Sequence, residues 1–453
     1  MKLPDQFIAS LKGIKGFEER DFINVHEAGN AVTSIRINQK KISEKDISFP
    51  VKRTVPWSSS GYYLESRPVF TLDPLFHAGA YYVQEASSMF LEQAILQLCN
   101  LDKVKTVLDL CAAPGGKSTL IQSLISAESV LVSNEINKSR SGILEENMVK
   151  WGGANVVVTN SSPEQFAKLP KLFDLIVVDA PCSGSGLFRK DPEAIEEWSL
   201  QNVQMCARRQ KDILEHAIPS LADGGILIYS TCSYSKEEDE DIATWCVGQG
   251  LTGMRLNIDP AWNIVEVEAA PGVFGYRFYP DKLDGEGFFL AAFKRSGENK
   301  RETIKYGSKK KAGVSVADMK VLEIWIDTGN MVAELWQKEI LLMPGRMREV
   351  LPLLQESLYL KFAGLRTGAV VRGELIPDHA FAISGLVKAD VDRFEVDHEN
   401  ALRYLRREEM ANVTIPAGWH LVTYKHVPLG WIKSLGNRIN NYYPKEWRIR
   451  MKG

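Results

Sequence analysis

Between residues 104 and 230, short apolar runs alternate with segments of helical pattern, and this alternation constrains the fold more than any other feature of the chain. Five runs are predicted to be strands: Thr106–Leu110, Ser129–Asn134, Asn155–Thr159, Phe173–Asp179 and Gly225–Ser230. Strands that alternate with helices indicate a mostly parallel α/β sheet. Because ligands bind at the carboxyl ends of the strands in such sheets, we expect the functional site there.

The chain of 453 residues is too long for one ordinary core. We predict four parts: an α+β N-terminal extension over 1–100, a catalytic α/β domain over 101–295, a basic linker over 296–312 and a C-terminal region over 313–453. The C-terminal region has a helical pattern over 313–365 and β-like runs, such as 418–424, beyond it. A smaller, partly β unit is therefore expected after the catalytic domain.

Composition excludes several classes of protein. The six cysteines are scattered, with no Cys-x-x-Cys pair, so neither a zinc site nor a disulfide scaffold is expected. The few scattered cysteines favour a reducing cytoplasm. The first residues carry charges throughout, unlike a signal peptide, and no stretch approaches a membrane span. The formal net charge is -2, so any positively charged surface that binds nucleic acid must be confined to part of the protein. A monomer is the default expectation.

A glycine-containing turn joins the first predicted strand to the first predicted helix, and it reads Asp109-Leu110-Cys111-Ala112-Ala113-Pro114-Gly115-Gly116-Lys117-Ser118. Glycine lets the backbone turn sharply and approach a ligand closely. The turn has cysteine where a Walker A loop needs its first glycine, and it is not G-x-G-x-x-G. Nucleoside triphosphates and NAD are therefore disfavoured as ligands.

Two carboxylates stand at the carboxyl ends of predicted strands. Glu135 follows the second strand, where an acidic side chain can accept hydrogen bonds from both ribose hydroxyls of a nucleoside. Asp179 ends the fourth strand and faces the same crevice. Glu135 could instead be an exposed loop carboxylate, and Asp179 could be a helix cap. The position of both residues at strand ends after the glycine turn favours a cofactor that contains a nucleoside.

Two cysteines follow neighbouring predicted strands: Cys182 in Asp-Ala-Pro-Cys-Ser-Gly and Cys232 in Ser-Thr-Cys-Ser-Tyr. The cysteines in helical patterns, Cys99, Cys206 and Cys246, are typical of packing instead. A thiolate that adds to C6 of cytosine makes C5 nucleophilic enough to accept a methyl group, and a second thiol can assist release. Asp179 is placed to serve N3 of such a base. Two thiols at the expected reaction face fit covalent chemistry of this kind.

Three motifs in this order resemble the Nop2/Sun/NSUN family of RNA 5-methylcytosine methyltransferases: CAAPGGKS at 111–118, DAPCSGSG at 179–186 and STCSY at 230–234. Further resemblance lies in 32–38, 73–89 and 277–294. The family implies a Rossmann-like class I methyltransferase domain that uses S-adenosylmethionine. It also implies Cys232 as the nucleophile and Cys182 as the residue that helps release the product, whereas DNA cytosine methyltransferases use the Pro-Cys residue as nucleophile.

The resemblance also implies a set of cofactor-binding residues: Cys111, Ala112, Ala113, Pro114, Gly115, Gly116, Lys117, Glu135, Ser162 and Asp179. One position departs from the family. Relatives often have an acidic residue after the third strand, and this chain has Thr159-Asn160-Ser161-Ser162 there. Ser162 is the best positional match, and its hydroxyl can hydrogen-bond the adenine edge without a charge.

Residues from 313 onward resemble the C-terminal part of the bacterial RsmF-like subgroup, most clearly in 428–450. This implies a PUA-like, RNA-binding region and 16S rRNA as the partner. Basic and aromatic residues interleave there, namely Lys433, Arg438, Lys445, Arg448 and Arg450 with Trp431, Tyr442, Tyr443 and Trp447. Cations can contact phosphates while aromatic rings stack on unpaired bases, or the rings can be core residues of a small β domain.

Two other functions stay open from the residues alone. Nothing in the motifs distinguishes rRNA from tRNA as the substrate, and only the C-terminal region favours small-subunit rRNA. A non-catalytic RNA-binding assembly factor would keep the fold, but it would not need Cys182, Cys232 and Asp179 together. In the N-terminal extension, Arg36 and Asn38 are either part of an RNA path or ordinary residues of a strand surface.

Overall fold

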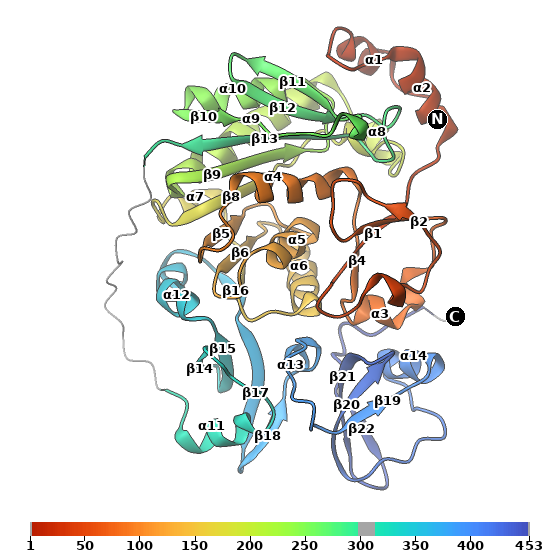
Figure 1. The fold of residues 1–453 in the computed structure, drawn as a ribbon, viewed down its shortest axis with the longest axis vertical. Helices are drawn as coiled ribbons and strands as arrows, with labels where there is room; N and C mark the ends of the chain where they lie inside the picture. The colour runs from red at the N-terminus through yellow and green to blue at the C-terminus, as the bar shows by residue number, and fades with distance from the viewer. Residues whose placement is uncertain (1, 298–312, 452–453) are drawn as a thin grey trace.

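The computed structural model describes residues 2–297 and 313–451. Residues 298–312, most of the predicted linker, therefore lie outside the described residues. A large mixed sheet occupies the middle of the molecule, with the N-terminal extension on one side and the C-terminal region below it (Figure 1). Among the helices of the described residues, none combines the length and apolar character that crossing a membrane requires.

The central sheet contains the predicted parallel strands, namely β5 (Thr106–Asp109), β6 (Val130–Asn134), β7 (Val156–Thr159), β8 (Phe173–Asp179) and β9 (Leu221–Thr231). Their order is β9-β8-β5-β6-β7, and each neighbouring pair is parallel. Such strands are almost continuously apolar because both faces of a parallel sheet are covered. The predicted Rossmann-like class is confirmed.

Antiparallel strands extend the β9 side of this sheet: β10 (Leu251–Met254), β11 (Val265–Ala270), β12 (Val273–Phe278) and β13 (Phe288–Arg295). β13 pairs directly with β9, with Phe289 opposite Thr231. The predicted late strand is thus an antiparallel neighbour of the strand that leads to Cys232.

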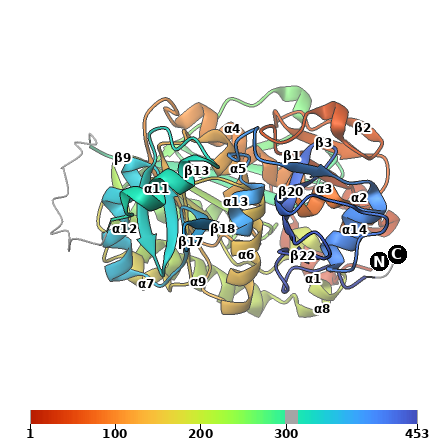
Figure 2. The same ribbon diagram turned by 90° about the horizontal axis from the view of Figure 1, so that it is seen from below.

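Helices cover both faces of the sheet, which gives two cores (Figure 2). One face carries α4 (Leu91–Leu98), α5 (Gly116–Leu124) and α6 (Lys138–Trp151), and the other carries α7 (Pro163–Phe166), α9 (Leu200–Ala217) and α10 (Glu240–Gly248). Asn137 caps α6 by accepting from the backbone N–H of Ser139 at 3.0 Å. The helices that follow β5 and β6 thus begin at the carboxyl edge of the sheet.

The N-terminal extension begins with α1 (Asp5–Leu11) and α2 (Glu19–Ala28), which pack against Tyr234 and Tyr279 of the central domain. A four-stranded sheet follows, in the order β2-β3-β1-β4, made of β1 (Ser34–Ile37), β2 (Val51–Thr54), β3 (Gly61–Leu64) and β4 (Tyr81–Val83).

Arg36 and Asn38 of this extension are both buried. The Arg36 guanidinium donates to Gln84 Oε1 at 2.9 Å and to Thr119 Oγ1 of α5 at 2.5 Å. Asn38 donates from Nδ2 to the carbonyl oxygen of Trp151 at 2.8 Å. Neither the RNA path nor the strand surface predicted for these residues is correct, because both side chains fasten the extension to the central domain.

The helical pattern predicted over 313–365 is only partly correct. Helices α11 (Val316–Glu323) and α12 (Gly345–Ser357) are present, but β14 (Val332–Trp336), β15 (Glu339–Met343) and β16 (Leu360–Ala363) are strands. β14 and β15 form a sheet with β17 (Leu365–Val371) and β18 (Glu374–Pro377). β16 lies between β15 and β17 in the chain but pairs antiparallel with β7 instead, so the C-terminal region adds an edge strand to the central sheet.

The chain ends in a second small sheet, ordered β19-β20-β21-β22. Its strands are β19 (Arg393–Glu395), β20 (Gly418–Tyr424), β21 (Val427–Ser434) and β22 (Ile439–Asn441), packed with α14 (His398–Arg406). This unit shares a hydrophobic core with the N-terminal sheet. Trp431 and Tyr443 are buried in the C-terminal region, whereas Tyr442 is exposed.

Candidate active site

The two predicted catalytic cysteines meet at the carboxyl edge of the central sheet. β8 and β9 are parallel neighbours with Asp179 opposite Ser230, so the loops that follow them begin side by side. The Cys182 and Cys232 sulfur atoms lie 3.1 Å apart, and both residues are half-buried. The backbone N–H of Gly186 also donates to the Cys232 carbonyl oxygen at 2.8 Å, which ties the two loops together.

The two thiols do not have the same surroundings. The hydrogen bond with Cys232 and burial raise the pKa of Cys182 well above the usual range for a thiol. Cys182 is therefore a neutral thiol near neutral pH, and its S–H can donate to the Cys232 sulfur. A neutral thiol is a poor nucleophile, so Cys182 in this state is suited to donating a hydrogen bond rather than to attacking a base.

Glu238 joins the two cysteine loops and was missed by the sequence prediction. Its carboxylate accepts from the Ser183 backbone N–H at 2.8 Å, from Ser183 Oγ at 2.5 Å and from Ser233 Oγ at 2.7 Å. Gln210 of α9 donates a further hydrogen bond at 3.1 Å. Ser183 follows Cys182 and Ser233 follows Cys232, so one buried carboxylate holds both neighbours of the cysteines.

Asp179 lies between the cysteine loops and the glycine turn. Its carboxylate forms an ion pair with Lys117 at 2.8 Å and accepts from Ser230 Oγ at 2.8 Å. Burial lowers the pKa of Lys117, but the charge of Asp179 and their hydrogen bond outweigh burial and raise that pKa overall. Lys117 therefore stays a cation, and it also interacts electrostatically with Cys232.

The predicted cofactor turn follows β5 and ends at the start of α5. Gly115 has φ +115°, in the region that favours glycine, and the next residue begins the helix. The Ala112 N–H donates to the carbonyl oxygen of Asn134 at 2.8 Å, and Arg140 donates to the Ala113 carbonyl at 2.7 Å. These contacts hold Cys111 through Lys117 between the ends of β5 and β6.

Three carboxylates line the carboxyl ends of β5, β6 and β8: Asp109, Glu135 and Asp179. Glu135 is buried, accepts from the Asn137 N–H at 2.8 Å and lies 3.5 Å from Arg140. Asp109 Oδ2 accepts from Ser118 Oγ at 2.6 Å, whereas Oδ1 is buried without a hydrogen-bond partner among the described residues. Burial raises the pKa of Asp109 to about 7. An open acceptor and a row of carboxylates fit a cationic nucleoside such as S-adenosylmethionine.

Ser162, which we predict to bind the cofactor, also has a structural role. It is the cap of α7, and its backbone N–H donates to Gln165 Oε1 at 3.0 Å. The preceding Ser161 is the more buried of the two hydroxyl residues. Ser162 lies at the carboxyl end of β7, on the same edge as Glu135, because β6 and β7 are parallel neighbours.

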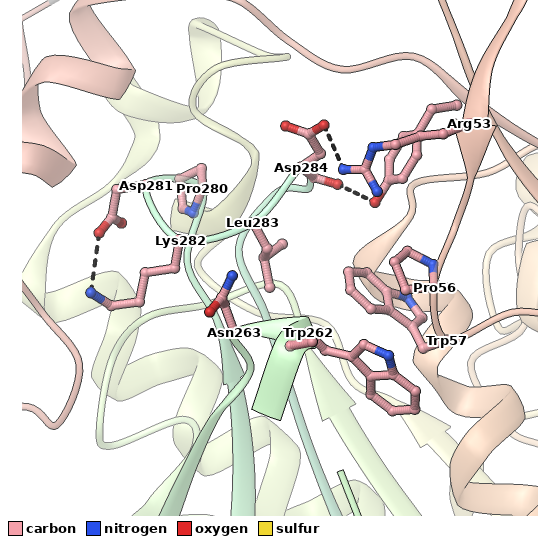
Figure 3. Close-up of a pocket in the computed structure, with 12 residues that line it drawn as sticks. Arg53, Pro56, Trp57, Trp262, Asn263, Pro280, Asp281, Lys282, Leu283 and Asp284 are labelled. Carbon is pink, nitrogen blue, oxygen red and sulfur yellow. Dashed lines mark hydrogen bonds and ion pairs between the residues drawn. The ribbon is translucent and has the colours of Figure 1, made fainter. Parts of the chain in front are cut away.

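A separate cavity of about 270 Å³ lies between the N-terminal extension and the loop that precedes β13 (Figure 3). Arg53 points toward Asp284 and forms an ion pair with it at 2.7 Å, while Trp57 and Trp262 line another wall. None of the predicted site residues lines this cavity. It is therefore distinct from the edge of the sheet where the cysteines meet.

Family models match three separate parts of the chain. The family model for 16S rRNA methyltransferase RsmB/F matches residues 95–294. The N-terminal domain of 16S rRNA methyltransferase RsmF matches residues 3–86, and the methyltransferase RsmF PUA domain matches residues 391–449. The PUA-like fold predicted for the C-terminal region is confirmed.

Solved structures agree with this fold. A methyltransferase homologue from Pyrococcus horikoshii is 28% identical, with a TM-score of 0.53 over 64% of this chain and 93% of that one. NSun6 from the same organism is 22% identical and has the same fold, with a TM-score of 0.55 over 65% of this chain and 99% of that one.

Curated relatives extend the similarity to the C-terminal region. The ribosomal RNA small subunit methyltransferase F of Cronobacter sakazakii is 31% identical and covers 91% of this chain and 89% of its own length. The protein of the same name from Aliivibrio fischeri is 32% identical over 98% of this chain and 93% of its own. The chain therefore belongs to the RsmF family of S-adenosylmethionine-dependent methyltransferases.

Proposed function

We propose that this protein transfers a methyl group from S-adenosylmethionine to C5 of a cytidine in 16S rRNA, through a covalent bond between Cys232 and C6 of the base. The observation that carries the proposal is the 3.1 Å approach of Cys182 and Cys232 at the ends of adjacent strands. A methyltransferase that acts on a nucleophilic nitrogen needs no such pair. A carbon that must first be activated does need a thiol.

The cofactor site consists of the turn Cys111–Lys117 together with Glu135 and Asp179. Glu135 accepts from the ribose hydroxyls, and the turn lets the backbone approach the ligand. Asp109 adds an acceptor that was not predicted from the sequence. Ser162 contributes from the end of β7, where its backbone also caps α7. When bound, the cofactor supplies an electrophilic methyl group.

Different residues of the chain then act at different steps of the reaction on the base. The Cys232 thiolate forms a bond to C6, and the displaced electron pair is stabilised by a proton at N3, next to Asp179. Lys117 holds the Asp179 carboxylate in place through an ion pair. After methylation, a base accepts the C5 proton and the electron pair of the C5–H bond forms the C5–C6 double bond. The sulfur–C6 bond breaks at the same time, and its electron pair returns to the Cys232 sulfur. Cys182 assists this release step.

RNA binding is assigned to the C-terminal region. Arg438 and Lys445 line one pocket together with Tyr442, whose ring is exposed, and Arg448 and Arg450 are exposed further along the chain. The ring of Tyr442 lies 4.5 Å from that of Trp419, measured between centroids. Cations that contact phosphates and an accessible ring suit unpaired RNA.

We also propose that the boundaries between the parts of the chain lie at residues 100, 295 and 312. The protein is proposed to be a monomer that acts in the cytoplasm.

The function is tested by mass spectrometry of nucleosides after incubation of the protein with methyl-labelled S-adenosylmethionine and small-subunit rRNA, with tRNA in parallel. Labelled 5-methylcytosine in rRNA alone is the expected result. Label in tRNA alone would keep the chemistry and overturn the substrate. Unlabelled RNA of both kinds, with cofactor binding intact, would favour a non-catalytic assembly factor.

Replacing Glu135 with glutamine is expected to weaken cofactor binding. The substitution keeps the size of the side chain but removes the charge that strengthens the hydrogen bonds to the ribose, which corresponds to about 1.5 kcal/mol and a roughly tenfold higher Kd. Isothermal titration calorimetry with S-adenosylmethionine measures this change. Glu128→Gln, at an exposed position before β6, is the matched control. An unchanged Kd for Glu135→Gln would exclude Glu135 from the cofactor site.

A further inference from the structure

The C-terminal region reaches the cofactor side of the central sheet through its edge strand. β16 runs antiparallel to β7, with Leu360 opposite Thr159. Because the strands are antiparallel, the beginning of β16 lies at the carboxyl end of β7. Residues 357–360 of the C-terminal region therefore lie beside the loop 160–162, at the edge where the cofactor residues gather.

Backbone hydrogen bonds fasten that loop to the C-terminal region. The Asn160 N–H donates to the Tyr359 carbonyl oxygen at 2.9 Å, and the Tyr359 N–H donates to Ser161 Oγ at 2.9 Å. Gln165 of α7 donates to the Ser357 carbonyl oxygen at 3.2 Å. Ser161 is buried, so its hydroxyl is a specific acceptor for a strand that comes from 198 residues further along the chain.

Ser161 is also connected to the cofactor residues through the buried side chain of Asn134. The Ser161 N–H donates to Asn134 Oδ1 at 3.0 Å, and Asn134 Nδ2 donates to the Ser161 carbonyl at 2.9 Å and to the Leu110 carbonyl at 3.1 Å. Asn160 donates from Nδ2 to the carbonyl oxygen of Glu135 at 2.6 Å. The network thus runs from Tyr359 through Ser161 to both ends of the cofactor site, the turn after β5 and Glu135.

A second set of contacts holds the helix that follows Glu135. Lys361 of β16 donates to Ser141 Oγ of α6 at 3.2 Å. Lys361 and Arg366 also lie 3.8 and 3.7 Å from the carboxylate of Glu145 on the same helix. The C-terminal region therefore supports both the loop after β7 and the helix after β6.

We propose that the C-terminal region completes the cofactor site: the hydrogen bond from the Tyr359 N–H makes Ser161 a positioning residue that holds the loop after β7 and, through Asn134, the turn after β5. The inference rests on the proposed cofactor site at Glu135. It gives the C-terminal region a second role beside RNA binding, because cofactor affinity then depends on a strand outside the methyltransferase domain.

The test uses the full chain and compares Ser161→Ala with Ser129→Ala. Ser129 is the matched control because its buried hydroxyl accepts a backbone N–H, that of Lys105 at 2.9 Å, at the opposite end of β6. Loss of one buried hydrogen bond of this kind costs about 1–1.5 kcal/mol, so the Kd for S-adenosylmethionine should rise about five- to tenfold in Ser161→Ala alone. Both variants should lose a similar amount of thermal stability.

Kinetics separate positioning from a general loss of structure. In Ser161→Ala the KM for the cofactor should rise while kcat at saturating cofactor and the Kd for RNA stay unchanged. Tyr359→Pro removes the donor from the other side, and Leu358, with ψ 154°, is already extended as a residue before proline must be. The two substitutions combined should weaken cofactor binding no more than one of them.

The outcomes distinguish this inference from the proposed site. If Ser161→Ala binds the cofactor as tightly as Ser129→Ala while Glu135→Gln binds it weakly, the support by the C-terminal region is overturned and the site stands. If neither Ser161→Ala nor Glu135→Gln changes the Kd, both are overturned. Fully additive effects of Ser161→Ala and Tyr359→Pro would show that the two residues act separately, which contradicts the proposed contact.

Discussion

Cys182→Ala should leave the protein covalently attached to its RNA. Without the second thiol, addition of Cys232 to C6 and methylation at C5 still proceed, but release stalls, so the adduct should exceed that of the parent by at least about tenfold. Denaturing gel electrophoresis after incubation with rRNA and S-adenosylmethionine detects the adduct as a slow band. Nuclease treatment should return that band to the position of the free protein.

Cys232→Ala is the necessary partner experiment. It should form no adduct and lose methylation by about a thousandfold or more, while its Kd for the cofactor changes little. Cys99→Ala, at the half-buried residue that follows α4, should behave as the parent in every assay. If instead Cys232→Ala accumulated the adduct and Cys182→Ala lost all addition, the roles would be reversed, as in DNA cytosine methyltransferases.

The double substitution Cys182→Ala/Cys232→Ala separates chemistry from folding. It should bind cofactor and RNA and form no adduct. The 3.1 Å approach of the two sulfur atoms explains why both positions matter, because a base that is attached to one thiol lies within reach of the other. A persistent slow band in the double variant would identify another nucleophile.

The central sheet could be predicted from sequence because its signals are local. The strands Thr106–Asp109 and Phe173–Asp179 are mostly apolar runs, and parallel order places their carboxyl ends together. From that order alone, Asp179, Cys182 and Cys232 could be expected at one edge. Their roles could not, because the roles depend on contacts between loops, such as the ion pair of Asp179 with Lys117.

Other features depend on contacts between distant segments and left no local signal. Arg36 alternates with apolar residues as a strand-surface residue would, yet its partner Thr119 lies on another domain's helix. The run Leu360–Ala363 is too short to be recognised as a strand, and its pairing with β7 is a tertiary event. Glu238 lies in a charged stretch typical of a solvated surface. Only its position, six residues after Cys232, could have indicated that Glu238 belongs to the site.

Glu238→Ala should damage both stability and catalysis. The substitution leaves the buried Ser183 N–H without its acceptor inside the protein, which costs about 1–3 kcal/mol of unfolding free energy, and the Gln210 amide keeps only its hydrogen bond to the Pro181 carbonyl oxygen. It also frees the two cysteine loops, and a misplacement of about 1 Å at the reacting atoms lowers kcat by about a hundredfold. Thermal unfolding and methylation rates at saturating cofactor measure the two effects.

Glu238→Gln distinguishes the hydrogen bonds from the charge. Burial raises the pKa of the Glu238 carboxyl, although its hydrogen bonds oppose this. The folded protein therefore holds a proton on this group more tightly than the unfolded chain, so the group's contribution to the unfolding free energy falls as the pH rises from about 4.5 to the raised pKa. The glutamine variant lacks that ionisation and should gain stability relative to the parent as the pH rises through this window.

Catalysis should respond differently from stability. Glutamine keeps one acceptor oxygen for the Ser183 N–H, so Glu238→Gln should retain far more activity than Glu238→Ala, and the cofactor Kd should stay near that of the parent in both. Glu237→Ala, at the neighbouring position outside this hydrogen-bond network, is the control and should change neither property. If Glu238→Ala methylated RNA at the parental rate well below its melting temperature, Glu238 would be a packing residue only. If it instead lost methylation but kept the cofactor Kd, its role would be to hold Cys182 and Cys232 in register.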